Sequence, residues 1–250
     1  MGLSIQHFFL PVVLAVIAAA YAAVGQAGAT GYIAAMGIAG LTPDVIRPAA
    51  LALNTLVAAI GTARFAQAGY VSWRGTYPFI LLGLPFSVLG GATHLPPAIY
   101  NPVVGLLLIV AAWRMMRSAR AASTLDERTP PHPPLLLSVT AGAVIGFVAG
   151  VTGIGGGIFV APLALTLHWL NTRHTAGLSA VFNLLNSAAA LTGLWSTSLT
   201  LPPELPYWLA AAALGGILGS WLGVRHLPPG VLRYILSALL LVGGVWLILV

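Results

Sequence analysis

Two glycine-rich segments interrupt otherwise apolar sequence, at 25–37 (GQAGATGYIAAMG) and at 150–162 (GVTGIGGGIFVAP). Glycine allows positive φ angles and lets a ligand approach backbone amide groups closely. A helix that begins at such an interruption presents unpaired N–H donors and the positive end of its dipole, and together these bind anions. The two segments therefore predict an anion site that needs no lysine. Close packing of helices is the alternative explanation of small residues at this spacing.

Amide and hydroxyl side chains lie within the apolar segments that follow the glycines. Asn183, Asn186 and Ser187 would share one helical face with Ser179, and Asn54 has the corresponding place in the first half. These side chains either contact a ligand in a central cavity or hydrogen-bond neighbouring helices, and the sequence leaves both open. The candidate substrate-binding residues of both motifs are Gln26, Gly28, Thr30, Asn54, Thr152, Gly153, Gly155, Gly156, Gly157, Asn183, Asn186 and Ser187.

Catalytic and metal-binding patterns are missing from the sequence. The chain has no cysteine, no His, Asp or Glu pair at metal-ligand spacing within an apolar segment, and no converging Ser, His and Asp set. The Gly-Lys-Ser/Thr of a phosphate-binding loop does not follow the glycines. We therefore expect no enzyme, no metal and no cofactor. Because no apolar segment has Asp or Glu at its core, proton coupling through a buried carboxylate is disfavoured.

The composition places these motifs in a membrane. Charged residues make up 6% of the chain and hydrophobic residues 59%, with a mean hydropathy of +0.98. A water-soluble protein must keep a substantially polar surface, and the apolar runs do not alternate as in a β-barrel. An all-α membrane protein is the remaining fold class. The expected partners are the lipid bilayer and a small anionic substrate. Nucleic acid is excluded because the few arginines form no basic face with interleaved aromatic residues.

Proline, glycine and charged residues divide the chain into ten apolar segments. We expect them at 8–24, 29–40, 46–66, 76–92, 98–116, 134–149, 156–170, 176–195, 206–224 and 230–250. The one extended polar stretch lies between the fifth and the sixth. The expected organisation is therefore a first repeat at 1–116, a cytoplasmic linker at 117–133 and a second repeat at 134–250, which together form a single transport domain.

The two sets of five segments resemble each other in sequence. Asn54 aligns with Asn183, and the motif HLPP, with His94 and His226, occurs in both halves. The glycines of the two interruptions align as Gly25 with Gly150, Gly28 with Gly153 and Gly31 with Gly156. Three weak matches in the same order indicate an internal duplication, which is a common feature of membrane carriers.

The two repeats are expected to have opposite orientations in the membrane. The segment at 29–40 is too short to cross about 30 Å of hydrocarbon, so it is either re-entrant or half of a broken helix. With a cytoplasmic linker, nine of the ten arginines follow the positive-inside rule if the second repeat is inverted. We therefore predict a multi-pass protein of the bacterial inner membrane with both termini in the periplasm. We also allow for a homodimer.

Arg47 is the exception to this charge distribution. It lies on the predicted periplasmic side, beside Asp44 and Pro48 and about two turns from Asn54. Arg47 either attracts anions toward the cavity, or closes over a bound anion as a gate, or is a loop residue paired with Asp44.

Several of these motifs together resemble the TauE/SafE family of sulfite and sulfonate exporters. They are the GxGGGxxxxP run at 153–162, SAVFNLLNSAAAL at 179–191, GYVSWR at 69–74 and the two HLPP motifs. The resemblance covers residues 8–250 and both halves, although GATGY at 28–32 replaces the denser glycine run in the first half. It implies anionic substrates such as sulfite, thiosulfate, sulfoacetate or related organosulfonates.

The sequence as a whole predicts a carrier that exports such anions by alternating access around a midplane site between two helix breaks. A carrier explains the inverted duplication, the paired glycine interruptions and the buried amides together. An anion channel with the same fold is the alternative, and its current would not saturate with anion.

Overall fold

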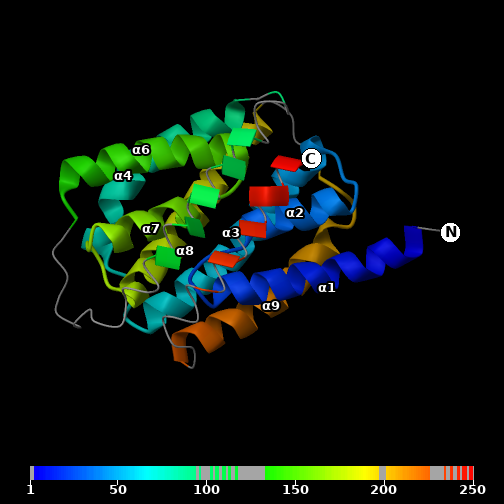
Figure 1. The fold of residues 1–250 in the computed structure, drawn as a ribbon, viewed down its shortest axis with the longest axis horizontal. Coiled ribbons are helices and arrows are strands. Elements are labelled where there is room, and N and C mark those ends of the chain that lie inside the picture. Colours follow the sequence, from blue (N-terminus) through cyan, green and yellow to red (C-terminus); the bar gives the residue numbers. More distant parts are fainter. Residues whose placement is uncertain are drawn as a thin grey trace.

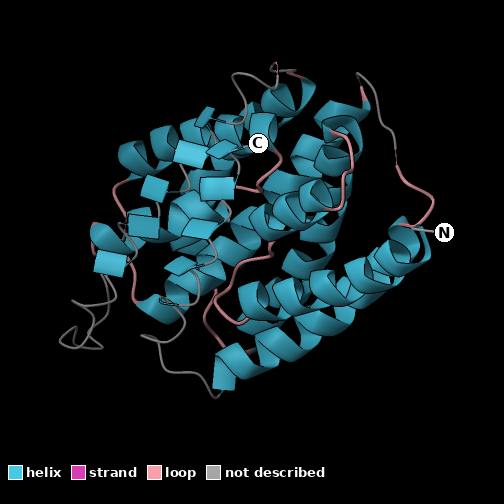
Figure 2. Cartoon of the chain, turned by 45° about the vertical axis from the view of Figure 1, so that its right-hand side comes forward, coloured by secondary structure: helices cyan, strands magenta, loops and turns pink. Residues whose placement is uncertain are grey.

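The computed structural model describes residues 3–93, 133–196 and 201–225, together with isolated residues between 96 and 117 and between 234 and 249. Every regular element in these ranges is an α-helix, and they contain no strand (Figure 2). The predicted all-α class is confirmed. His94 and His226 lie outside the described residues, as do most of the linker and of the expected segments 98–116 and 230–250.

The helices follow the expected apolar segments closely. They are α1 (Leu3–Ala22), α2 (Ala29–Ile38), α3 (Pro43–Gln67), α4 (Trp73–Ala92), α6 (Leu135–Thr152), α7 (Gly157–Thr166), α8 (Thr172–Trp195) and α9 (Leu205–Arg225). Some begin earlier than expected because their first turns are polar or contain proline. Pro43 opens α3, where its missing N–H costs nothing, and Asn171 caps α8 by accepting a hydrogen bond from the His174 backbone N–H at 3.0 Å.

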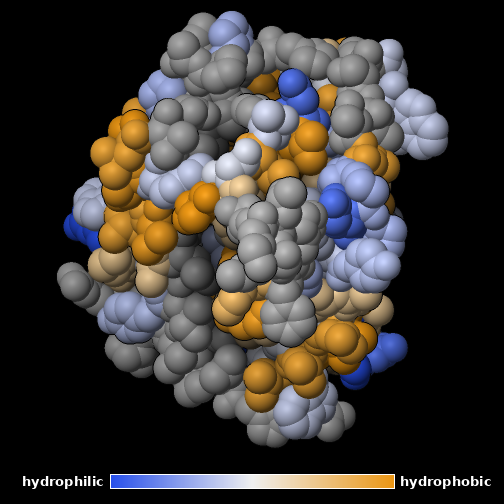
Figure 3. All heavy atoms as spheres, turned by 90° about the vertical axis from the view of Figure 1, so that its right-hand side faces the viewer, coloured by the Kyte–Doolittle hydropathy of each residue, from blue (hydrophilic) through white to orange (hydrophobic). Residues whose placement is uncertain are grey.

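The chain is a multi-pass membrane protein. Five of the described helices (α3, α4, α6, α8 and α9) are long and apolar enough to cross a bilayer. Large apolar side chains are exposed around the outside, among them Val16, Leu136 and Tyr207, which are 63%, 76% and 74% exposed. Hydrophobic residues cover much of the coloured surface in Figure 3, and hydrophilic ones are few there. Lipid is the solvent that such a surface requires.

The longest helix contacts join segments that are far apart in sequence. α1 packs along α9, α4 packs along α6, and α3 and α8 pack against each other between these two pairs (Figure 1). The same pattern holds when the first half is exchanged with the second: α3 also packs on α9, and α8 on α4. The short helices lie against the central ones, α2 on α3 and α7 on α8. Each half is therefore completed by helices of the other.

Glycine stripes at four-residue spacing make these long contacts close. A Cβ added to any glycine of either stripe would overlap a backbone carbonyl oxygen of the partner helix. The stripes are Gly142, Gly146 and Gly150 on α6, facing α4, and Gly215, Gly219 and Gly223 on α9, facing α1. The packing explanation of small residues thus holds for these glycines, of which only Gly150 belongs to one of the two glycine-rich segments.

Candidate functional site

Two helix breaks with the same backbone geometry lie near the centre of the fold. α1 ends at Ala22 and α2 begins at Ala29, and α6 ends at Thr152 and α7 begins at Gly157. The N-cap of α2 is Gly28 with φ 95°, and the N-cap of α7 is Gly156 with φ 84°. Both angles lie in the left-handed region that favours glycine. The glycine interruptions thus create two helix N-termini, as predicted.

The structure corrects the register in which the two glycine segments were aligned. Gly28 corresponds by its role to Gly156 and not to Gly153, and the turn glycine Gly25 (φ 75°) corresponds to Gly153 (φ 77°). The spacing is therefore 128 residues, close to the 129 that separates Asn54 from Asn183. The alignment failed because it matched glycines by their order in sequence, whereas two of those in the second segment belong to α6 and to its C-cap.

The two aligned asparagines have the same task at the two helix starts. Asn54 Oδ1 accepts a hydrogen bond from the Ala29 N–H at 3.1 Å, and Asn183 Oδ1 accepts one from the Gly157 N–H at 2.8 Å. Each asparagine lies on the long helix that follows the break, and its side chain is 1% exposed. Each therefore satisfies the first N–H of a short helix, which has no partner within that helix.

The amide nitrogens of these asparagines link the two halves. Asn54 Nδ2 donates to Ser187 Oγ at 2.7 Å, and Asn183 Nδ2 donates to Gln26 Oε1 at 3.1 Å. Gln26 Nε2 in turn donates to the Gly157 carbonyl at 3.0 Å. A Cβ on Gly155 would collide with Asn54, Asn183 and Ser187, so backbone without a side chain fills the middle of the network. Asn54 and Asn183 thus join helices in this structure.

Asn186 differs from the other two asparagines. Its side chain is 1% exposed, and neither Nδ2 nor Oδ1 has a hydrogen-bond partner. Its Nδ2 faces the start of α7, because a Cβ on Gly156 would lie 3.0 Å from that atom. An unsatisfied buried polar group costs about 1–3 kcal/mol. Asn186 is therefore the predicted site residue whose hydrogen-bonding capacity the fold does not use.

The remaining predicted residues have local partners. Thr30 Oγ1 lies 2.7 Å from Tyr21 Oη, and Thr152 Oγ1 donates to the Val148 carbonyl at 2.7 Å. Gly28 lies under the ring of Tyr32, since a Cβ there would be 2.9 Å from the ring. The two tyrosines were missed because aromatic residues in an apolar run resemble ordinary core residues.

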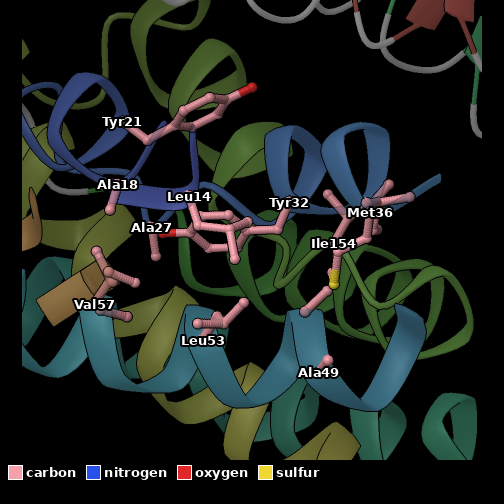
Figure 4. Close-up of a cluster of buried hydrophobic side chains, with 14 of the residues drawn as sticks. Leu14, Ala18, Tyr21, Ala27, Tyr32, Met36, Ala49, Leu53, Val57 and Ile154 are labelled. Carbon is pink, nitrogen blue, oxygen red and sulfur yellow. The ribbon is translucent and has the colours of Figure 1, made fainter. Parts of the chain in front are cut away.

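The first helix break is packed with apolar and aromatic side chains. Tyr32 is fully buried, and in Figure 4 its ring reaches from α2 back toward Leu14. Val24 and Ala27 from the first turn and Ile154 from the second belong to the same cluster, so both turns contribute side chains to it. The Tyr32 hydroxyl has no hydrogen-bond partner. Space at the α2 start is therefore taken by side chains of the protein itself.

Arg47 lies at the C-terminal ends of two helices. Its Nη1 donates to the Thr93 carbonyl at 3.1 Å, and its Nη2 lies 3.0, 2.9 and 2.8 Å from the carbonyl oxygens of Gly90, Gly91 and Gly150. Its side chain also covers Gly153, whose added Cβ would be 3.0 Å from Arg47 Cγ. These contacts give Arg47 a structural position between α3, α4 and α6, and the prediction that it attracts anions stays a prediction.

Metal and acid–base chemistry find no support among these side chains. No group of three His, Cys, Asp or Glu side chains that could hold a metal lies in the described ranges. The central polar groups are amides, hydroxyls and backbone N–H groups. Such groups bind by hydrogen bonds and carry no charge of their own.

Comparison with known proteins gives this geometry a context. The chain matches the sequence model of a family described as sulfite exporter TauE/SafE over residues 10–247. It is 53% identical over 247 residues to a probable membrane transporter protein of Sinorhizobium fredii, covering 99% of this chain and 97% of the relative. A probable membrane transporter protein of Methanocaldococcus jannaschii is 26% identical over 200 residues, covering 76% and 73%. No solved structure matches.

Proposed function

Because the chain belongs to the sulfite exporter TauE/SafE family, we propose that it carries small sulfur-containing anions across the bacterial inner membrane. Membership of the family makes the protein a membrane transporter, and we propose no enzymatic activity for it. The proposed substrates are sulfite, thiosulfate, sulfoacetate or other organosulfonates, and the proposed direction is export. The mechanism we propose is alternating access around the two helix breaks.

The main observation in favour of an anion site is that the side-chain amide of Asn186, beside the start of α7, has no hydrogen-bond partner. A sulfonate or sulfite oxygen accepts hydrogen bonds, and the N–H groups of Asn186 Nδ2 have no partner in the protein. The N-terminus of α7 adds the positive end of a helix dipole at the same place. The N-cap Gly156 has no side chain of its own, and Asn186 Nδ2 borders it together with the ring of Phe182 and the methyl group of Ala149. We assign the substrate to this second helix break.

The closed network in the centre supports a carrier over a channel. The hydrogen bonds from Asn54 to Ser187 and from Asn183 to Gln26 join the two halves across the midplane of the fold. A conducting pore would need these groups apart at rest. A carrier separates them alternately on one side and on the other, and the equivalent helix caps of Asn54 and Asn183 support such a two-sided device.

The exchange symmetry of the helix contacts supports two repeats divided at the linker, and the arginine distribution supports their inversion, as the sequence predicts. α2 and α7 have 10 residues each, about 15 Å of helix, so we propose that each returns to its side of the membrane as a re-entrant arm. Both termini are then periplasmic and the linker is cytoplasmic. Reporter fusions at residue 122 and at the C-terminus should read opposite compartments, and the same reading from both would contradict inversion. A homodimer stays a prediction.

The substitution Asn186→Leu tests the site. Leucine has nearly the same size and no polar atoms, so it removes the unsatisfied amide without opening a cavity. We expect the affinity for sulfite, thiosulfate or sulfoacetate to fall by about tenfold to a hundredfold, the value of one or two hydrogen bonds to a charged group. The thermal stability of the purified protein should be unchanged or higher.

Saturable anion flux into proteoliposomes and a thermal-shift screen of the same anions measure the two effects. Thr192→Val, an exposed position on the same helix, is the matched control and should keep both affinity and flux. Unchanged affinity in Asn186→Leu would contradict the assignment. A flux that rises linearly with anion concentration would favour the channel.

A further inference from the structure

Three residues on one face of α3 lie between the N-terminal end of the helix and the hydrogen-bond network around Asn54 and Asn183. Arg47, Leu51 and Asn54 follow each other at spacings of four and three residues, which align side chains along a helix. On α8, which packs against α3, Ala190 lies one helical turn beyond Asn186 and Ser187 of the network. The order from the network outward is thus an amide, then an apolar layer, then an arginine.

The apolar layer is a small cluster of its own. Leu51 is fully buried, Ala190 is 1% exposed and Leu194 is 4% exposed, and the three form one cluster. The cluster lies between the amides of the network and the N-terminal end of α3. An anion leaving the network on this side would have to pass it.

Arg47 holds the helices around this layer together. Its guanidinium bridges the C-terminal carbonyls of α4 (Gly90, Gly91 and Thr93) and the Gly150 carbonyl near the end of α6. The C-terminus of a helix carries partial negative charge, so one cation here stabilises two helix ends. The planar guanidinium makes such multiple contacts, whereas an ammonium group cannot span them in the same way. α6 leads directly into the second helix break, so Arg47 also fixes that break.

The opposite side of the network has a small residue where this side has Arg47. The residue 129 positions later, at the same place on α8, is Ala176, and its backbone and methyl group lie directly against Gly25. The next layer there consists of Ala180 and Gly61, since a Cβ added to Gly61 would lie 3.8 Å from the Ala180 methyl group. Alanine has no donor that could bridge two helix ends.

On that opposite side, Arg173 contacts Tyr70 at the surface of the protein. Arg173 Nη1 donates to Tyr70 Oη at 2.8 Å in an exposed position. An exposed contact of this kind contributes little to stability. The two sides of the network are therefore closed by unequal means.

We propose that Arg47 is the latch of a gate formed with Leu51, Ala190 and Leu194, and that the gate on this side opens only when Arg47 leaves the carbonyls of α4 and α6. The other side, where Ala180 faces Gly61 and Ala176 stands in the place of Arg47, opens first. The inference rests on the proposed alternating access but not on the identity of the anion. With the predicted topology, the latched gate faces the periplasm.

Cysteine accessibility tests the latch without any substrate, because the native chain contains no cysteine. Single cysteines are placed by Ala190→Cys on the latched side and by Ala180→Cys on the other. A membrane-impermeant thiol reagent is applied to membrane vesicles of both orientations. With Arg47 intact, the Ala180→Cys variant should react faster than the Ala190→Cys variant. Adding Arg47→Gln to Ala190→Cys should raise its labelling rate by about tenfold or more, as expected when a charge-assisted contact no longer holds one state.

Arg74→Gln is the matched control, since Arg74 is an exposed arginine at the other end of α4, and it should change neither rate. Arg47→Lys should give an intermediate rate in the Ala190→Cys background, and it decides the matter if Arg47→Gln does not insert. Equal labelling of Ala190→Cys with and without the Arg47 substitution would overturn the proposal, and so would faster labelling of Ala190→Cys than of Ala180→Cys with Arg47 intact. If labelling shifts as expected but no sulfur-containing anion is carried, the latch stands and the proposed substrate is wrong.

Discussion

The break between α1 and α2 and the break between α6 and α7 share their backbone geometry but differ in their surroundings. Both have a glycine N-cap at positive φ, and both have an asparagine on the first N–H of the short helix. An aromatic ring lies against each N-cap, Tyr32 at Gly28 and Phe182 at Gly156. At the second break, the side chain of Asn186 faces the N-cap without a partner.

This difference indicates that the internal symmetry produces the two helix breaks, whereas a few side chains that differ between the halves form the binding site. The residue of α3 that corresponds to Asn186 is Val57, which is fully buried in the apolar cluster around the first break. The second break therefore keeps a whole unpaired amide group, whereas the first keeps only the unpaired hydroxyl of Tyr32 within an apolar cluster. A single anion site follows more naturally from this asymmetry than two.

The largest effect should come from placing the same side chain at both N-caps. Asparagine tolerates positive φ better than other residues, so Gly28→Asn and Gly156→Asn strain the backbone about equally. We expect Gly156→Asn to reduce transport to background because its side chain enters the space in front of Asn186. Gly28→Asn should keep most of the native rate, since Val57 stands at that break in the place of Asn186. Equal losses of flux in proteoliposomes would mean that both breaks bind substrate.

A smaller effect should distinguish two asparagines on the same helix. Asn183→Leu removes the cap of α7 and the partner of Gln26, and it leaves two buried polar groups unsatisfied. We expect it to destabilise the protein by about 3 kcal/mol, visible as a lower melting temperature in detergent. Asn186→Leu should show no such loss. If both variants melt at the same reduced temperature, Asn186 has partners and the comparison between the two breaks fails.

The smallest effect should come from the unpaired hydroxyl at the first break. Tyr32→Phe removes a buried oxygen without a partner and keeps the ring that fills the break. We expect unchanged transport and a gain of stability below about 1 kcal/mol. A loss of transport with normal stability would show that the first break also contacts substrate through a polar group. The proposed difference between the two breaks would then be wrong.

Much of this architecture could be predicted from the residues alone. The glycine interruption predicted the start of α7 beside Gly156, and the spacing between Asn54 and Asn183 predicted that the two have equivalent places. The starts of α3 at Pro43 and of α8 at Thr172 lie before the expected ones. The glycine register could not be found in the same way, because Gly153 and Gly156 have the same letter but different roles: one is a C-cap and the other an N-cap.

The properties of the site itself depend on distant contacts. Asn183 and Asn186 are both asparagines on one face of one helix, and only the positions of Gln26 and Gly157 make the first a bridge and leave the second unpaired. Arg47 likewise was noticed for breaking the charge rule. Its partners are backbone carbonyls of two other helices, and no pattern of side chains in the sequence points to them.

The exchange of packing partners between the halves has a consequence for how the protein is made. α1 lies along α9, whose first residue is Leu205, so the first helix to leave the ribosome waits for one of the last. Until then its small-residue face has only lipid or a helper protein to cover it. Folding in the membrane must therefore end with a late closure that brings the glycine stripe of α9 onto α1, and a chain truncated before α9 would leave both α1 and α3 without the helix that completes their packing.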